Sequence, residues 1–367
     1  MFNPDTSFVE GVRSVLRNVF GEQQMSQFGA HCRYGHVEVI INPAAGQDRP
    51  ILNTLNTVFN LCSLSWNVAI TNRPGDGKRL AAQAVERGAD LVAVYGGDGT
   101  VMEAASGMLG SGVPMAILPG GTANVMAVEL GIPRDLASAA ALAIGMPSTE
   151  RCLDVGMATY KGQELPFILR AGIGAEAMMV NGATREMKDR MGTLAYTVSA
   201  LSLMKEEPVD ACFTITIDGH TEQMMGPTLL VGNSVNVGFP EMRLIQNSNV
   251  NDGLLDVVVV QKQDVPRLMT VLSMAANMLK QNEPPQISYW QGQHIIVDAD
   301  PPQPIVLDGE LIGETPFEAR VLRDAVRVIV PDGALKLSTT STRRVERLSR
   351  RQGNNGNGPK LPPRTYV

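Results

Sequence analysis

Glycine-rich turns occur three times in the first third of the chain, each after a run of apolar residues. They are Asn42–Gly46, Gly96–Thr100 and Gly120–Asn124. Glycine allows backbone N–H groups to approach an anion closely, and the start of a following helix adds a partial positive charge. Open α/β sheets bind their ligands at the carboxyl ends of parallel strands. Three such turns at consecutive strand ends therefore predict a phosphate-binding site.

Asp98 lies inside the second of these turns. A carboxylate among phosphate-binding amides repels phosphate unless a cation or a substrate hydroxyl lies between them. Mg²⁺ that bridges Asp98 to the phosphates would remove this conflict. The alternative is a turn aspartate that hydrogen-bonds its own backbone. The chain contains no GxxxxGK[ST] phosphate loop, and Gly96–Thr100 lacks the GxGxxG spacing of dinucleotide-binding folds.

The segments around these turns follow two patterns. Strands that alternate with helices predict a doubly wound α/β domain, with the strands at residues 37–41, 66–71, 91–95 and 115–118. After Asp154, strand-like segments separated by Asp-Gly turns predict a mostly antiparallel β domain, with helical insertions near 176–205 and 264–281. The predicted parts are an N-terminal amphipathic extension (residues 1–36) and an ATP-binding α/β domain (37–148). A β-sandwich substrate domain (149–335) and a basic flexible tail (336–367) follow. The last strand of the sandwich either stays there or returns to the first domain.

Composition restricts the class of protein. A length of 367 residues suggests two domains, and 44% hydrophobic with 19% charged residues is typical of a globular chain. The net charge of −6 argues against a nucleic-acid partner. Four widely separated cysteines without metal-binding spacing predict a reduced, cytoplasmic protein with structural thiols. We expect neither a secretory signal nor a membrane-spanning segment.

Two segments near the ends of the chain have basic residues on polar surfaces. Residues 8–20 have helical apolar spacing with Arg13 and Arg17 on the polar face, so this helix docks either on the protein itself or in a membrane interface. From Arg343 onward the tail contains seven basic residues and one acidic residue. It either holds the enzyme to anionic lipid or only keeps it soluble.

Taken together, the motifs resemble the catalytic region of the diacylglycerol kinase and sphingosine kinase superfamily, and its soluble bacterial-type lipid kinases most closely. Five of them occur in family order: GGDGT at 96–100, PGGTAN at 119–124, GIGAE at 172–176, NDGLLD at 251–256 and DGE at 308–310. The resemblance covers roughly residues 37 to 335.

This resemblance implies an NAD kinase-like nucleotide-binding domain packed on a β-sandwich, with the active site between them. It implies ATP and Mg²⁺ as cofactors and a lipid hydroxyl, first that of diacylglycerol, as the phosphoryl acceptor. The catalytic base falls on Glu310, with Asp98 as the second catalytic residue. A base is needed because an alcohol is a poor nucleophile at neutral pH, and the glycine before Glu310 leaves its carboxylate accessible. The implied nucleotide contacts are Asn42, Gly46, Thr71, Gly96, Gly97, Asp98, Gly99, Thr100, Val101, Met102, Gly121, Thr122 and Asn124.

The resemblance also implies a structural metal site, formed by Asp252 with backbone oxygens of Asn249 and Leu254. Carboxylate and carbonyl oxygens suit Mg²⁺ or Ca²⁺; the alternative is an Asp-Gly hairpin turn. Glu176 replaces a commoner aspartate that holds the lipid head group in sphingosine kinases, so it is the predicted substrate residue. Two departures remove polar groups near the nucleotide, since Met102 and Val125 stand where many relatives carry Asn and Asp.

Other functions remain open at this level. An NAD kinase shares GGDGT, and a sphingoid-base kinase belongs to the same superfamily. A lipid- or nucleotide-binding regulator without catalysis is a further alternative, although the intact Asp98 and Glu310 count against it. We expect a lipid partner at the membrane surface, no nucleic acid, and a homodimer if an edge strand of the sandwich pairs with a second copy. The expected location is cytoplasmic or peripheral on the cytoplasmic face of the membrane.

Overall fold

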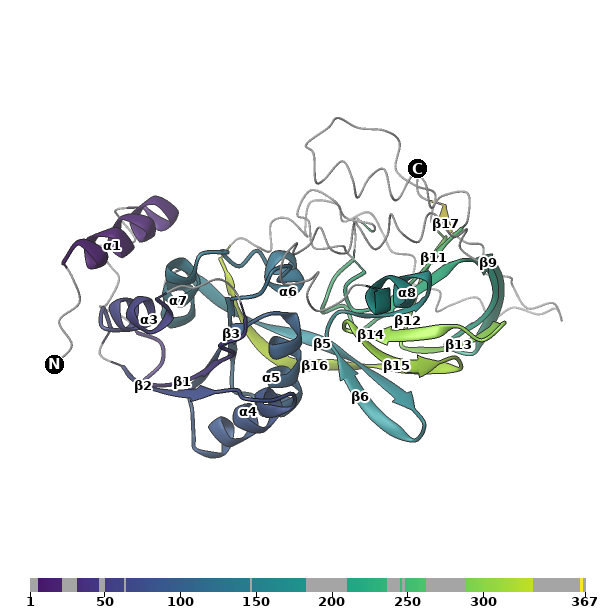
Figure 1. The fold of residues 1–367 in the computed structure, drawn as a ribbon, viewed down its shortest axis with the longest axis horizontal. Coiled ribbons are helices and arrows are strands. Elements are labelled where there is room, and N and C mark those ends of the chain that lie inside the picture. Colours follow the sequence, from purple (N-terminus) through teal and green to yellow (C-terminus); the bar gives the residue numbers. More distant parts are fainter. Residues whose placement is uncertain are drawn as a thin grey trace, which may run out of the picture.

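A computed structural model of the chain shows two halves joined by long shared strands (Figure 1). It describes residues 6–21, 32–45, 50–62, 64–145, 147–182, 210–235, 245, 248–261, 288–332 and 364–365. Gly46, the predicted helix near 264–281 and most of the predicted insertion at 176–205 lie outside these residues, as does the basic tail apart from Arg364 and Thr365.

Four parallel strands form one end of a ten-stranded sheet, sheet A, in the order β2-β1-β3-β4. The apolar run of β3 is buried along its whole length, as expected for a parallel strand covered on both faces. The sequence predicted all four strands, and the doubly wound α/β class is confirmed. Their bounds are β1 His36–Ile41, β2 Ser65–Ile70, β3 Leu91–Gly96 and β4 Met115–Pro119.

Helices cover both faces of this parallel region (Figure 1). α4 and α5 pack together on one face, where a Cβ on Gly107 would overlap the Lys78 carbonyl group. α3 and α7 pack together on the other face, and Asp135 caps α7 by accepting the Ser138 N–H at 2.8 Å. The helix bounds are α1 Thr6–Phe20, α3 Ile51–Phe59, α4 Asp76–Glu86, α5 Asp98–Met108, α6 Val125–Glu129 and α7 Leu136–Ile144.

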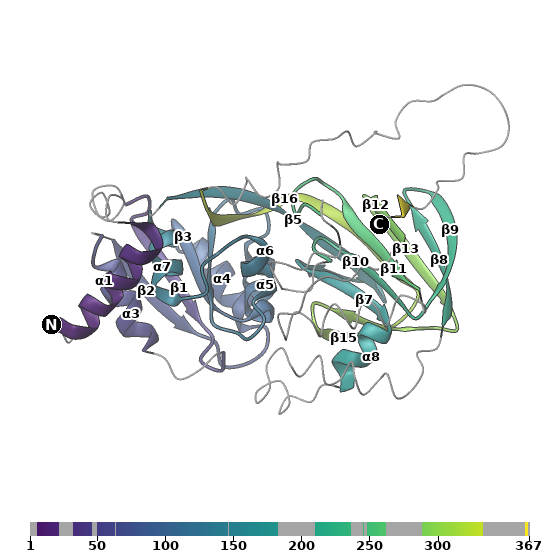
Figure 2. The ribbon, with the colours of Figure 1, turned by 90° about the horizontal axis from the view of Figure 1, so that it is seen from above.

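Two long antiparallel strands, β5 (Ser148–Tyr160) and β16 (Phe317–Pro331), run from one half into the other (Figure 2). At its end β16 pairs in parallel with β4, through Val328 and Met115. At its start it pairs with β13 of the second half. Sheet A is therefore continuous across both halves, and the last long strand belongs to both.

The second half is a β-sandwich, as the sequence predicted. The seven strands of sheet B, in the order β15-β14-β7-β10-β11-β12-β17, face β8, β13 and the start of β16 in sheet A. Every second residue of β8 is buried, so Phe213 and Ile215 meet Leu229 and Val257 of sheet B in one core. The remaining bounds are β6 Gln163–Phe167, β7 Arg170–Gly174, α8 Ala175–Gly182, β8 Ala211–Ile217, β9 His220–Gly226, β10 Thr228–Gly232, β11 Leu255–Val260, β12 Ser288–Gly292, β13 His294–Asp300, β14 Pro304–Leu307, β15 Glu310–Glu314 and β17 Arg364–Thr365.

The amphipathic helix α1 packs on the protein itself. Val12 and Leu16 are buried and the helix contacts α3 and α7, whereas Val15 and Val19 are exposed. Among the described helices, none is long and apolar enough to cross a membrane.

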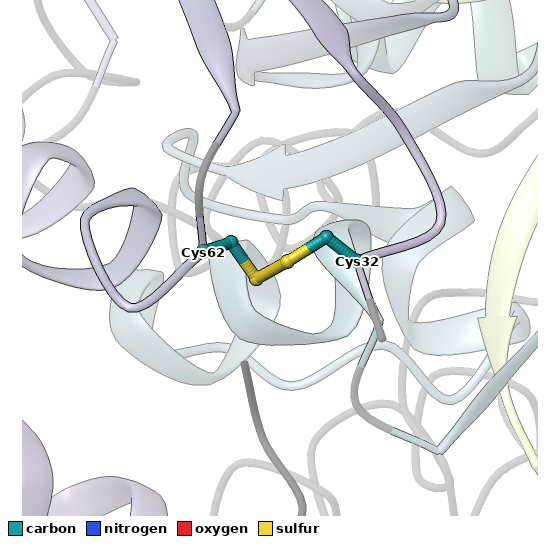
Figure 3. The surroundings of a disulfide bond; sticks show 2 residues. All are labelled: Cys32 and Cys62. Atoms are coloured by element: carbon teal, nitrogen blue, oxygen red, sulfur yellow. A yellow bond between two sulfur atoms is a disulfide. The ribbon is translucent and has the colours of Figure 1, made fainter. Parts of the chain in front are cut away.

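One expectation about the cysteines is wrong. Cys32 and Cys62 form a disulfide that joins the segment before β1 to the turn after α3, with their Cα atoms 6.0 Å apart (Figure 3). Cys152 and Cys212 are free thiols. The prediction of four reduced cysteines failed because sequence separation alone gives no information about distance in space.

Candidate active site

The second and third glycine turns lie against each other at the carboxyl ends of β3 and β4. The Gly96 carbonyl accepts the N–H groups of Gly120 and Gly121 at 2.9 and 3.2 Å. A Cβ on Gly121 would lie 2.5 Å from the Gly97 Cα, so no larger residue fits between the two turns. The close approach explains why glycine is needed there, independently of any ligand.

The first turn is tied to the second through Asn42. Its Nδ2 donates to the Thr100 Oγ1 at 2.8 Å, and its Oδ1 accepts the Ala44 N–H at 3.0 Å. Thr71 is buried at the end of the neighbouring strand and donates its N–H to the Ile41 carbonyl at 3.0 Å. The structure thus brings the described residues of all three turns to one edge of the sheet.

The third turn is closed by its own asparagine. Asn124 has a positive φ of 49°, accepts the Gly121 N–H at 3.0 Å and donates to the Gly121 carbonyl at 2.6 Å. Thr122, between them in sequence, is exposed. Of the other predicted nucleotide contacts, the Val101 side chain lies in the core, so only its backbone faces this edge, and Met102 is half-buried beside Ser106.

The carboxylate of Asp98 meets the start of α6, where its Oδ1 accepts the Met126 N–H at 3.1 Å. Burial raises its pKa, while N–H groups of Val125, Met126 and Asp98 itself and the charge of Arg170 partly oppose this. These amides stabilise the carboxylate without a metal ion, so the sequence argument for Mg²⁺ at this position is not compelling by itself. A carboxylate has about four acceptor positions, so Asp98 still fits a Mg²⁺ ligand.

Glu103, which the sequence analysis missed, fixes the turn after β2. Its two carboxylate oxygens accept the N–H groups of Gly75 and Gly77 at 2.8 and 2.9 Å. The helix that carries Asp98 therefore also caps the start of α4. Glu103 lies five residues after Asp98 in the sequence, and this spacing alone does not indicate that the amides of Gly75 and Gly77 are its partners.

In the second half, Asp308 holds the β14–β15 hairpin onto the start of β7. Its carboxylate accepts the N–H groups of Ile168, Leu169 and Arg170 at 2.8, 3.0 and 2.9 Å, and its own N–H donates to the Arg170 carbonyl at 2.9 Å. Burial raises the pKa of Asp308 to about 6. Glu310, two residues later, is exposed at the start of β15.

Glu176, the predicted substrate residue, forms an ion pair with Arg170. The Arg170 Nε and Nη2 both donate to its Oε1, at 2.9 and 2.7 Å. The charge of Arg170 also acts on Asp98 and on Asp308, lowering the pKa of both carboxyls against the larger effect of burial. The charge of Arg170 therefore acts both on the second glycine turn, through Asp98, and on the hairpin that carries Glu310, through Asp308.

The predicted metal site at Asp252 is engaged by protein donors. Its Oδ1 accepts the Leu254 N–H at 3.1 Å and its Oδ2 accepts from the Gln291 side chain at 3.2 Å, as in an Asp-Gly turn. Burial raises the pKa of Asp252. In the part of the chain that the structure describes, no group of three or more His, Cys, Asp and Glu side chains could hold a metal ion. A metal at Asp252 would depend on backbone oxygens of Asn249 and Leu254, and it stays a prediction.

Glycine turns gathered at the edge of an α/β sheet, together with a sandwich hairpin that presents a carboxylate, define a two-domain kinase architecture. Residues 36–158 match the family described as "Diacylglycerol kinase catalytic domain", and residues 169–330 match "YegS C-terminal NAD kinase beta sandwich-like domain". The chain belongs to the diacylglycerol kinase superfamily and is a phosphotransferase of that type.

Individual relatives are similar over most of this chain. An uncharacterized protein of Synechocystis is 30% identical over 312 residues, covering 81% of this chain and 70% of that protein. A diacylglycerol kinase of Bacillus subtilis is 28% identical over 299 residues, covering 80% of this chain and 95% of that protein. The crystal structure of a proposed diacylglycerol kinase from Bacillus anthracis superposes with a TM-score of 0.67 at 26% identity, covering 82% of this chain and 97% of that one.

Proposed function

We propose that this protein transfers the γ-phosphoryl group of ATP to the hydroxyl of a membrane lipid, with diacylglycerol as the preferred acceptor. The observation that supports the proposal is that Arg170, whose N–H donates to Asp308 at 2.9 Å, also lowers the pKa of Asp98 through its charge. A phosphate-binding edge and an accessible carboxylate then face the same region, as phosphoryl transfer to an alcohol requires.

In this mechanism the phosphates of ATP lie along the backbone amides of the three turns. When bound, Mg²⁺ at Asp98 would neutralise charge on the phosphate oxygens. Glu310 accepts the proton of the lipid hydroxyl as its oxygen attacks the γ-phosphorus. The new P–O bond forms as the bond to the β-phosphate oxygen breaks, and ADP leaves.

The acceptor is assigned to lipid on two grounds. The relatives named above include a protein named diacylglycerol kinase, 95% of which this chain covers. Leu311, directly after Glu310, and Met178 on the contacting helix α8 are exposed apolar residues, 52% and 44% accessible. Exposed apolar side chains beside a reactive carboxylate suit a substrate with acyl chains. We accordingly propose peripheral contact with the cytoplasmic face of a membrane.

We also propose that two copies pair, which the mass of the protein in solution tests.

The test is an assay with radiolabelled ATP and Mg²⁺ against separate panels of diacylglycerol vesicles, sphingosine and NAD. We expect label in phosphatidic acid and none without Mg²⁺. Label in phosphorylated NAD or in sphingosine phosphate would instead identify an NAD kinase or a sphingoid-base kinase. Nucleotide binding without any labelled product would favour a regulator.

The role of Glu310 is tested by Glu310→Gln in the same assay. We expect kcat to fall at least about 100-fold, the usual range for loss of a general base, with ATP affinity changed less than about twofold because Glu310 lies outside the glycine turns. Glu314→Gln is the matched control, since Glu314 is an exposed glutamate on the same strand. Equal turnover in both variants would remove Glu310 from the mechanism.

A further inference from the structure

The Arg170–Glu176 pair is mostly enclosed but not sealed from solvent. The side chains are 20% and 18% exposed, and the closest atoms, Nη2 and Oε1, are 2.7 Å apart. Arg170 starts β7, and Glu176 lies in the first turn of the helix α8 that directly follows this strand. The pair is therefore held by a strand of sheet B and the helix that follows it, and both side chains keep some contact with solvent.

Two glycines make room for the pair. Gly232 of β10 is the cross-strand partner of Arg170, and a Cβ there would lie 2.5 Å from the Arg170 Cβ. A Cβ on Gly172 would lie 2.7 Å from the Glu176 Cδ. Neither glycine has a positive φ, so other residues could adopt the same φ at these positions. Space for the two side chains, and not backbone conformation, accounts for glycine at these positions.

The backbone of Arg170 is fixed to the hairpin that carries the proposed base. Its N–H and carbonyl groups both bond to Asp308, each at 2.9 Å. The charges of Arg170 and Asp98 act on each other's pKa, so the guanidinium group belongs to the same region as Asp98. Asp98, Glu176, Asp308 and Glu310 place four carboxylates in this region, which on its own would repel a triphosphate. A fixed cation among them offsets that repulsion.

We propose that Arg170 binds the γ-phosphate of ATP while it is transferred, and that Glu176 orients the guanidinium group for this task and does not bind the lipid head group. This inference rests on the proposed phosphoryl transfer. A guanidinium group has five N–H donors in a rigid plane, so one edge can bind a carboxylate while another binds phosphate oxygens. Arginine in this position stabilises the charge on the transferring group, which is otherwise surrounded by carboxylates.

The first experiment measures nucleotide affinity and needs no lipid. The full-length protein is titrated with ADP and with the β,γ-imido analogue of ATP in the presence of Mg²⁺. We expect Arg170→Met to leave ADP affinity within about twofold and to weaken the analogue about tenfold, because only the analogue carries a γ-phosphate for this charge-assisted contact. Arg320→Met is the matched control, since Arg320 forms an exposed 2.7 Å ion pair with Glu164. Unchanged preference for the analogue in Arg170→Met would overturn the proposal.

The second experiment measures turnover with diacylglycerol vesicles. We expect kcat to fall at least about 100-fold in Arg170→Met, to be partly retained in Arg170→Lys, and to fall about tenfold in Glu176→Gln with an unchanged KM for lipid. A raised lipid KM with normal kcat in Glu176→Gln would instead assign Glu176 to the head group. If the wild type phosphorylates no lipid, the proposed function fails, while the nucleotide titration still decides the role of Arg170.

A double variant separates a catalytic role from a structural one. Removing one partner of an enclosed ion pair leaves an unpaired charge and destabilises the fold, whereas removing both charges restores much of the stability. We therefore expect Arg170→Met with Glu176→Gln to unfold at a temperature closer to wild type than Arg170→Met alone, yet to remain as inactive. Recovery of turnover together with stability would show that the pair only supports the fold.

Discussion

At the scale of single residues, Asp308 shows how one carboxylate can organise a site through backbone hydrogen bonds. It accepts three consecutive backbone N–H groups and so fixes the hairpin two residues before Glu310. Burial outweighs these hydrogen bonds and raises its pKa from 3.8 to about 6. Between these values the folded protein binds a proton that the unfolded chain has released. The contribution of Asp308 to stability is therefore complete below about pH 4 and is lost as the pH rises through about 6.

Asp308→Asn tests this titration. The variant cannot ionise at this position, so we expect the free energy of unfolding of the wild type to fall relative to the variant by up to about 3 kcal/mol between pH 4 and pH 7. Urea denaturation across this range measures the difference, and other raised carboxyls such as Asp98 cancel because both proteins contain them. Parallel pH profiles for the two proteins would contradict the raised pKa.

The sequence predicted some of these residues and missed others for a clear physical reason. Asp98 and Glu310 stand in short motifs whose chemistry is local, a carboxylate beside glycine amides. Arg170 and Glu103 act through partners that only the fold supplies, namely Glu176 across a strand-to-helix turn and the amides of Gly75 and Gly77 on another helix. Nothing in the spacing of these residues indicates such contacts.

At the scale of elements, the glycine turns serve two different purposes. Gly121 is required by packing, because a Cβ there would lie 2.5 Å from the Gly97 backbone. Gly99, at the second position of α5, has no protein atom within 4 Å of such a Cβ. Protein packing therefore does not explain glycine at position 99. A ligand that approaches the backbone closely, such as phosphate, would explain it.

Two alanine substitutions separate these purposes. Gly121→Ala should reduce the free energy of unfolding by about 1–3 kcal/mol, because the neighbouring backbone must move. Gly99→Ala should leave stability unchanged or slightly higher, since alanine favours a helix, yet weaken ATP binding about tenfold. Urea denaturation and nucleotide titration of each variant give the four values. Normal ATP affinity in Gly99→Ala would exclude close phosphate contact at this turn.

The positions and the parallel type of the first four strands could be predicted from the sequence, because buried apolar runs between turn residues have few alternatives. How far β5 and β16 extend could not be predicted from the sequence. Both alternate between two environments, the parallel sheet and the sandwich, and β16 contains an irregularity between Leu322 and Val326. The Cys32–Cys62 disulfide was missed because it depends on how α3 returns toward β1.

At the scale of the whole molecule, the two halves are coupled where this irregularity occurs. Asp154 of β5 is 2% exposed, and its carboxylate accepts the Gly253 N–H at 2.6 Å and the Asp324 N–H at 2.8 Å. Its own N–H donates to the Val250 carbonyl at 2.9 Å. One side chain thus joins β5, the part of β16 where the pairing register shifts, and the turn that contains the predicted metal site. Because the glycine turns and Glu310 lie in different halves, this junction sets their separation.

Asp154→Ala should therefore affect stability and catalysis together. The buried Gly253 N–H and the Asp324 N–H then lose their acceptor, which lowers the free energy of unfolding by about 2–5 kcal/mol. The coupling between the two halves also weakens. In calorimetry we expect one cooperative transition for the wild type and a lower, broadened or divided transition for the variant. Turnover should fall well below that of wild type even at temperatures where the variant is folded, while nucleotide affinity changes little because the turns belong to one half. Asp332→Ala, at an exposed position just after β16, is the control. A variant that melts in one sharp transition and keeps full turnover would show that the shared strands alone hold the two halves in position.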